Sequence, residues 1–184
     1  MNPRFFLKIK FLFKKPELVV IVGNENVREI ISQLLKSHLK ENKDFFIFNA
    51  EKEKINKFIF FFKNSRLPVL AMTDGANHVL LKKLPGNLYF VLNGDNEKTR
   101  EAEHLITCKK IKFGLGKRND VFVSDIVKSA GGVNFKINYK GSVVPFWLAS
   151  GNDLYPALSA VCIGIIFGLN LVEMSESLKE MKIG

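Results

Sequence analysis

The chain is poor in cysteine and histidine, the residues that most often build disulfides and zinc sites. Its two cysteines, Cys108 and Cys162, form no C-x-x-C pair, and its three histidines are scattered along the 184 residues. These absences argue against a disulfide framework and against a zinc site. A reducing compartment, the cytoplasm, is therefore the predicted location, with contact to a membrane left open by the N-terminal segment described below.

The sequence also lacks a complete phosphate-binding loop. A strand-like run over 18–23 leads into a helix-like segment over 27–39, and nucleotide-binding domains carry a glycine-rich loop with a Lys and a Ser or Thr at such a junction. Here the junction reads Gly23-Asn24-Glu25-Asn26, with one glycine and no lysine. Glu25 is a further obstacle, because a carboxylate in the first helical turn complements the helix dipole and repels phosphate.

Acidic residues are outnumbered by basic ones, 18 to 28, which gives a formal net charge of +10. This excess favours an anionic partner such as nucleic acid, an acidic membrane surface or a phosphorylated ligand. Part of it equally fits a biased codon composition. Specific nucleic-acid binding is the weakest of these alternatives, because the aromatic residues lie in runs typical of a core and no nucleic-acid-binding signature occurs.

Residues 1–16 form a basic and aromatic segment, NPRFFLKIKFLFKKP after the initiator. It has no small-residue cleavage site, and its apolar run is too short and too charged to span a bilayer. Two interpretations remain. Residues 4–15 would lie as a helix on an anionic membrane with their lysines directed outward, or the helix packs on the protein's own surface and ends before Pro16. The second is slightly favoured.

Residues 17–184 are predicted to form a single α/β domain. Strand-like runs at 18–23, 44–50, 67–73, 87–93 and 110–116 alternate with helix-like segments at 27–39, 52–62 and 97–106. This alternation predicts a mostly parallel sheet with helices on both faces. Three further strands, 121–127, 133–138 and 142–147, are joined by turns too short for a helix and must be antiparallel. The run FIFFF at 58–62 exceeds one helix face, so it is either core or an oligomer face.

Residues 154–172 carry no charge and reach the length of a transmembrane helix. Pro156 suits a first helical turn, however, and Gly168 is typical of a helix end. We therefore predict a buried core helix followed by a short surface helix that begins at Ser175.

Three stretches resemble the central, ATP-binding domain of the Mur ligases, especially the member that adds D-alanyl-D-alanine. YFVLNGDNEKTREAEHL (89–105) is similar to that family's strand ending in Leu-Asn-x-Asp-Asp. KIKFGLGKRNDVFVSDIVKSAGGVNFKI (110–137) is similar to its Phe-Gly strand and antiparallel hairpin. SGNDLYPALSAVCIGIIFGLNLVEMSESL (150–178) is similar to its Gly-x-His-Asn-x-x-Asn-Ala-Leu helix. The stretches occur in the family's order and cover most of the chain.

The resemblance implies an ATP-dependent carboxylate–amine ligase with Mg²⁺ as cofactor, and it places nucleotide-binding positions in this chain. They lie at the loop after the first strand, at two strand ends and at the start of the last motif: Gly23, Asn24, Thr73, Asn93, Asp95, Asn152 and Asp153. Pro156 stands where the family has a second Asn that contacts the adenine, and proline has no side-chain donor.

These departures fall on the chemistry, so we expect a degenerate and truncated relative with no catalytic residue, no metal ligand and at most vestigial binding of ATP and magnesium. The family's N-terminal and C-terminal domains are expected to be absent. The predicted function is a non-catalytic binding or regulatory module of peptidoglycan metabolism, with an envelope ligase or a second copy as partner. The alternative is a residual nucleotide-binding ligase component that acts with a partner chain.

Overall fold

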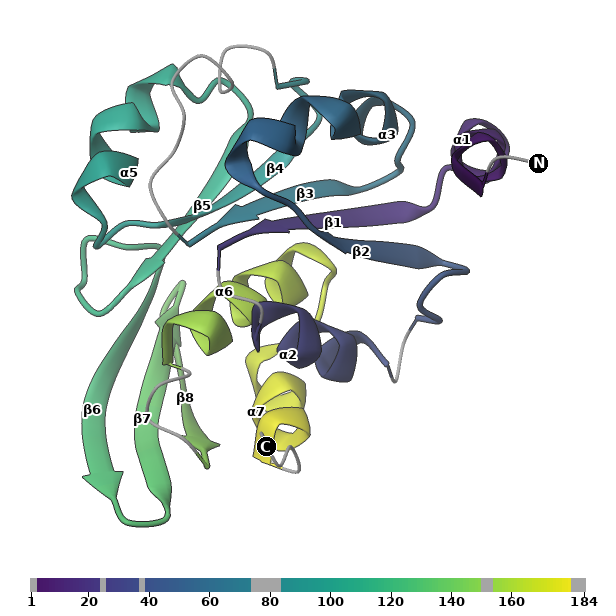
Figure 1. Ribbon diagram of the computed structural model, residues 1–184. Coiled ribbons are helices and arrows are strands. Elements are labelled where there is room, and N and C mark those ends of the chain that lie inside the picture. The colour runs from purple at the N-terminus through teal and green to yellow at the C-terminus, as the bar shows by residue number, and fades with distance from the viewer. Residues whose placement is uncertain (1–2, 24–25, 37–38, 74–83, 150–153, 180–184) are drawn as a thin grey trace.

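An eight-stranded sheet organises the protein. The computed structural model describes residues 3–23, 26–36, 39–73, 84–149 and 154–179. The strands follow the order β2-β1-β3-β4-β5-β6-β7-β8, parallel from β2 to β6 and antiparallel from β6 to β8 (Figure 1). Their bounds are Glu17–Val22 (β1), Phe45–Asn49 (β2), Pro68–Met72 (β3), Tyr89–Asn93 (β4), Lys109–Gly114 (β5), Val121–Ser129 (β6), Gly132–Tyr139 (β7) and Ser142–Leu148 (β8). The predicted parallel sheet and antiparallel segment are both confirmed.

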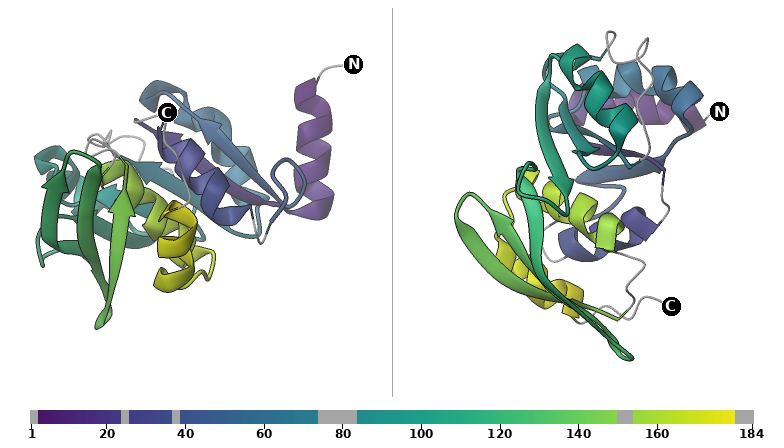
Figure 2. Two further views of the ribbon diagram at one scale, coloured as in Figure 1. Left: turned by 90° about the horizontal axis from the view of Figure 1, so that it is seen from below. Right: turned by 90° about the vertical axis from the view of Figure 1, so that its left-hand side faces the viewer.

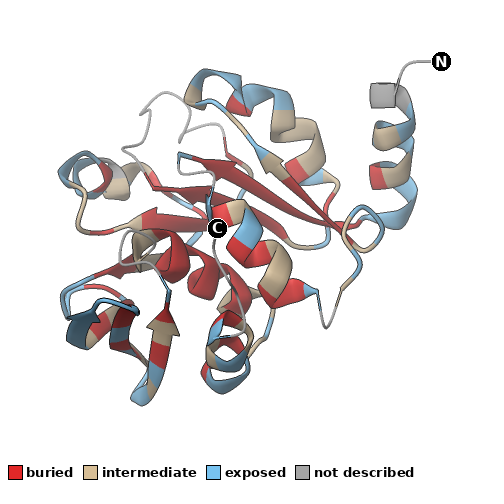
Figure 3. Cartoon of the chain, turned by 60° about the horizontal axis from the view of Figure 1, so that its bottom comes forward, coloured by how far each residue is buried: buried red, intermediate tan, exposed pale blue. Residues whose placement is uncertain are grey.

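Helices cover both faces of the parallel strands (Figures 1 and 2). One face packs against α2 (Asn26–Leu35), α6 (Leu154–Ile166) and α7 (Leu171–Lys179). The other face packs against α1 (Pro3–Lys14), the 3₁₀ helix η1 (Lys52–Phe58) and α3 (Ile59–Lys63). Helix α5 (Glu97–Ala102) is followed by the 3₁₀ helix η2 (Glu103–Leu105), and Leu105, Ile106 and Cys108 also pack on this face. Neighbouring residues of β1 alternate between the two cores, and the strand is buried throughout (Figure 3). This explains its uninterrupted apolar sequence.

Helix α6 is the buried core helix that the sequence predicts. Its residues from Pro156 to Gly164 are all buried, and it ends at Ile166, two residues before Gly168 with its positive φ of 88°. No helix in the described part of the chain is long and apolar enough to cross a membrane. The next helix, α7, begins at Leu171 and not at Ser175. Asn170 and Glu173 cap each other's backbone N–H groups at 2.9 and 3.2 Å, which starts the helix earlier.

Helix α1 packs on the protein's own surface, as predicted, through one fully buried side chain. The ring of Phe11 lies 5.3 Å from that of Phe46 and 4.9 Å from that of Phe61. α1 therefore covers part of the FIFFF run and supplies packing that the run itself could not provide. The single helix predicted over 52–62 is instead η1 followed by α3. With three residues per turn, η1 places Ile55 and Phe58 on one side, toward the core.

Candidate functional site at the carboxyl ends of the strands

The junction between β1 and α2 is short. β1 ends at Val22 and α2 begins at Asn26, so three residues connect them. Gly23 has φ 116°, a conformation that strongly favours glycine. Arg28 forms an ion pair of 2.9 Å with Glu41, so its charge is already matched. Asn24 lies outside the described residues.

Thr73 follows β3, next to the end of β1. Its backbone N–H donates to the carbonyl of Val22 at 3.1 Å, and its hydroxyl lies 3.4 Å from the same oxygen. Met72 is the register partner of Val22, so the parallel pairing brings Gly23 and Thr73 to neighbouring positions. Thr73 is buried, and its hydroxyl is directed at backbone.

Asn93 and Asp95 lie together in the turn after β4. The side-chain oxygen of Asn93 accepts the N–H of Asp95 at 3.0 Å, and Gly94 donates its N–H to the carbonyl of Phe113 at 2.9 Å. The turn is thus fastened to the end of β5. The next residue, Asn96, caps α5 by accepting the N–H of Thr99 at 3.1 Å.

The Asp95 carboxylate is the centre of a hydrogen-bonded cluster that joins β4, the loop after β5 and α6. One oxygen accepts the Leu115 N–H at 2.6 Å and the Tyr155 hydroxyl at 3.2 Å. The other accepts Arg118 at 3.0 Å and the Asn119 amide at 3.2 Å. Each oxygen therefore has two donors. We call these five residues the Asp95 cluster.

Two glycines make room for this cluster. A Cβ on Gly94 would lie 2.0 Å from the side-chain oxygen of Asn119, and one on Gly114 would lie 2.6 Å from the Asp95 carboxylate. The Asn119 amide also donates to the Gly116 carbonyl at 2.9 Å, which shapes the loop between β5 and β6. The sequence analysis did not identify Arg118, Asn119 and Tyr155 as members of this site. The one sequence signal for close packing here is the pair of glycines, Gly94 after β4 and Gly114 at the end of β5.

The protonation states of the cluster do not suit acid–base catalysis. Burial raises the pKa of Asp95, but the donors from Leu115, Arg118, Asn119 and Tyr155 outweigh it, so the pKa lies below its ordinary value. Burial and the Asp95 charge raise the pKa of Tyr155. At neutral pH the carboxylate is ionised and the phenol protonated, and neither pKa lies near 7, where a general acid or base works best.

Four of the seven predicted site residues form two neighbouring pairs, and the other three lie outside the described residues. Gly23 lies next to Thr73, and Asn93 lies beside Asp95, all at the carboxyl edge of the parallel strands where α/β sheets place ligands. Asn152 and Asp153 fall outside the described residues. Within the described ranges, no group of three or more His, Cys, Asp or Glu side chains is placed to hold a metal ion.

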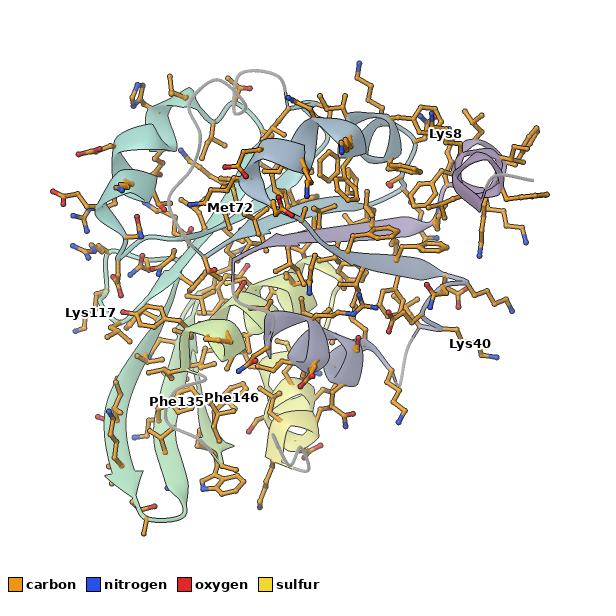
Figure 4. The ribbon with its side chains drawn as sticks, in the orientation of Figure 1. Lys8, Lys40, Met72, Lys117, Phe135 and Phe146 are labelled. Carbon is orange, nitrogen blue, oxygen red and sulfur yellow. The ribbon has the colours of Figure 1, made fainter. Side chains whose placement is uncertain are left out.

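A cavity of about 980 Å³ opens on the face of the sheet that carries α1 and η1, with Gly23 in its lining. Its apolar wall includes Phe48, Phe58 and Phe61, and three lysines line it: Lys8, Lys54 and Lys57. Lys8 lies on the side of α1 nearest α3, 5.4 Å from the centre of the Phe60 ring (Figure 4). Lys54 is paired with Glu51. The cavity thus combines aromatic surface with an excess of positive charge.

Comparison with known proteins finds similar sequences and structures among the Mur ligases. No family model matches the chain. It is 25% identical over 95 residues to UDP-N-acetylmuramoyl-L-alanyl-D-glutamate--2,6-diaminopimelate ligase of Bacillus cereus, a match that spans 50% of this chain and 19% of that relative.

Solved structures share the whole fold at low sequence identity. MurF from Acinetobacter baumannii has a TM-score of 0.77 at 12% identity, over 100% of this chain and 51% of that one. MurF from Thermotoga maritima in complex with ADP has 0.73 at 15%, over 97% and 52%. The UDP-N-acetylmuramate:L-alanyl-gamma-D-glutamyl-meso-diaminopimelate ligase of Neisseria meningitides has a TM-score of 0.74 at 14% identity, over 97% of this chain and 70% of that one. The chain has the fold of these Mur ligases and spans about half the length of the two MurF structures.

Proposed function

We propose that this Mur-ligase-like chain has no ligase activity of its own and serves as a binding or regulatory module in peptidoglycan metabolism. The observation that carries the proposal is the connection of three residues between β1 and α2. A phosphate-binding loop of the type G-x-x-x-x-G-K-[ST] takes about eight residues, because its backbone N–H groups must surround the phosphates. Three residues without a lysine do not supply that geometry.

Among the predicted positions that the structure describes, Asp95 and Thr73 do not fit magnesium and ATP either. A carboxylate offers about four lone-pair positions, and the four donors around Asp95 occupy them. The hydroxyl of Thr73 is directed at the Val22 carbonyl. Asp95 and Thr73 are thus engaged in holding strand ends together.

The partner that we propose is a complete Mur ligase of the same cell. The Bacillus cereus relative is named for joining 2,6-diaminopimelate to a UDP-N-acetylmuramoyl dipeptide, and this chain matches 19% of it. A second copy of the chain is the other partner that fits the same reasoning.

Adding the purified protein to the Mur ligases of its own cell should change the rate of ligation at least about twofold at equimolar concentration, because a regulatory module acts through a complex. The rate of ADP release and co-elution in size-exclusion chromatography measure this. A positively charged protein of similar size and unrelated fold serves as control. Unchanged rates together with separate elution would refute the regulatory role.

The cavity beside Gly23 favours one second function, binding of a phosphate-bearing ligand with a flat apolar body. Aromatic rings suit the body of such a ligand and lysines suit its phosphate. Lys57 lines the cavity and its side chain is exposed. A nucleotide bound here would make the chain a residual ligase component that acts with a partner.

Titration with ATP, ADP and inorganic phosphate distinguishes the two functions. The first predicts a melting temperature unchanged within about 1 °C. A nucleotide at 100 times its dissociation constant would add about 2.7 kcal/mol, or at least about 5 °C for a chain of this size. Lys57→Glu tests whether such a rise comes from the cavity, and Lys63→Glu is the control, because Lys63 is also exposed but lies outside the cavity lining. If the rise occurs and only Lys57→Glu abolishes it, the cavity binds nucleotide and the first function is wrong.

A further inference from the structure

Helix α1 presents apolar side chains to solvent on the face opposite its buried anchor. Phe11 points inward and is fully buried, whereas Phe6, Leu12 and Phe13 are 49%, 49% and 83% exposed, and Ile9 is 36% exposed. Residues 6, 9 and 13 follow helical spacing and form one stripe, with residue 12 beside it. We call these four residues the α1 ridge. Surface helices ordinarily bury such a stripe.

Positive charge flanks the ridge. Lys8 and Lys10 lie over the rings of Phe60 and Phe46, at 5.4 and 4.7 Å from their centres, on the two sides of the helix that border the protein. Lys14 and Lys15 are exposed at the helix end. The helix contains no acidic residue. The ridge is therefore an apolar surface, and every charged residue that α1 places beside it is basic.

The position of α1 leaves the ridge accessible. The helix stands at one end of the molecule, far from β6, β7 and β8, in both Figure 1 and the left view of Figure 2. A flat surface can therefore approach the ridge from outside without meeting the rest of the sheet.

We propose that the α1 ridge docks on an anionic membrane surface. The four apolar side chains enter the boundary between headgroups and acyl chains, and Lys14 and Lys15 at the exposed helix end interact with the anionic headgroups. Charge selects this occupant over a second copy of the chain, because two ridges packed face to face would bring their lysines together. The inference is independent of the proposed function, since it concerns where the protein sits and not what it binds in its cavity or which ligase it contacts.

Sedimentation with vesicles tests the docking. Wild-type protein should bind vesicles of equal phosphatidylcholine and phosphatidylglycerol at least about tenfold more strongly than vesicles of phosphatidylcholine alone. Phe13→Glu should weaken binding to the anionic vesicles at least about tenfold, because it places a carboxylate in the inserted face. Val172→Glu, which introduces the same charge at an apolar side chain that is 54% exposed on α7, should leave binding unchanged.

Lys14→Glu provides a second variant, which alters charge without touching the ridge, and it should reduce binding several-fold. Raising the salt concentration to 0.5 M should do the same, because screening shortens the reach of the lysines. Absence of binding, equal binding to neutral vesicles, or equal losses in Phe13→Glu and Val172→Glu would overturn the proposal. A dimer in analytical ultracentrifugation that Phe13→Glu dissolves, without vesicle binding, would assign the ridge to a second copy instead.

Discussion

Replacing Asp95 by asparagine should lower the free energy of unfolding by about 2 to 3 kcal/mol. The change removes the negative charge that pairs with Arg118, and it places an amide N–H₂ group where the surrounding groups are themselves hydrogen-bond donors. The side chain is 16% exposed, so water cannot fully replace the lost acceptor. The Asp95 cluster joins the end of β4 to the loop after β5 and to α6, and it should loosen as a unit. Urea denaturation followed by circular dichroism measures the effect.

Asp125→Asn is the matched control. Asp125 pairs with Lys136 at 2.7 Å on the outer part of β6, where its side chain is 61% exposed. Exposed pairs contribute little, and asparagine tolerates the positive φ of 53° at this position. The control should cost less than about 0.5 kcal/mol. Equal losses in the two variants would show that the cluster does not hold the strand ends together.

The loss should also depend on pH. The pKa of Asp95 lies below its ordinary value in the folded protein, so the folded state binds protons less readily than the unfolded chain. The stability that follows is fully present above the unfolded pKa of about 4 and disappears as pH falls through the folded pKa. The difference between wild type and Asp95→Asn should therefore be constant from pH 7 to 5 and shrink below about pH 4. A difference that grows on acidification would reverse the assigned sign.

Phe11→Ala should cost about 3 to 5 kcal/mol, the range for removing a fully buried phenylalanine. Phe11 is the only side chain of α1 that is buried among those described, and it contacts the rings of Phe46 and Phe61. Its loss removes the anchor of the helix and uncovers part of the FIFFF run. Urea denaturation reports the free energy, and hydrogen exchange reports whether amides of residues 3–14 become unprotected before the rest.

Phe13→Ala is the matched control for this prediction. The same residue type is 83% exposed two positions along the helix, so its removal should change stability by less than about 0.5 kcal/mol. Equal costs would mean that α1 does not dock through Phe11. The pair also separates the anchor of the helix from the α1 ridge, because only the ridge variant should alter binding to vesicles.

Much of the scaffold could be predicted from the sequence because it rests on local patterns. The apolar run at 18–23 and the short turns near 130 and 140 indicate a buried strand and two hairpin connections without any knowledge of distant residues. The start of α7 was misplaced because Asn170 and Glu173 act as a reciprocal pair. The predicted site residues gather at one edge for a general reason, since parallel strands end on the same side.

The contacts of the site could not be predicted in the same way. Arg118 and Tyr155 reach Asp95 from 23 and 60 positions away along the chain. Hydrophobic periodicity carries no information about such pairs. The aromatic run at 58–62 left core and oligomer face equally open, and the choice depended on whether α1, over 40 residues earlier, would fold back onto it.

The amino-acid sequence by itself determined the alternation of strands and helices, the lack of a lysine after β1 and the excess of positive charge, because each is a property of neighbouring residues or of composition. Only the tertiary structure decided that Asp95 is occupied by four donors and that α1 buries Phe11 while it exposes Phe13. The physical reason is that hydrogen bonding and burial depend on which segments, distant in the sequence, are brought together by the fold. A local sequence pattern does not specify those contacts.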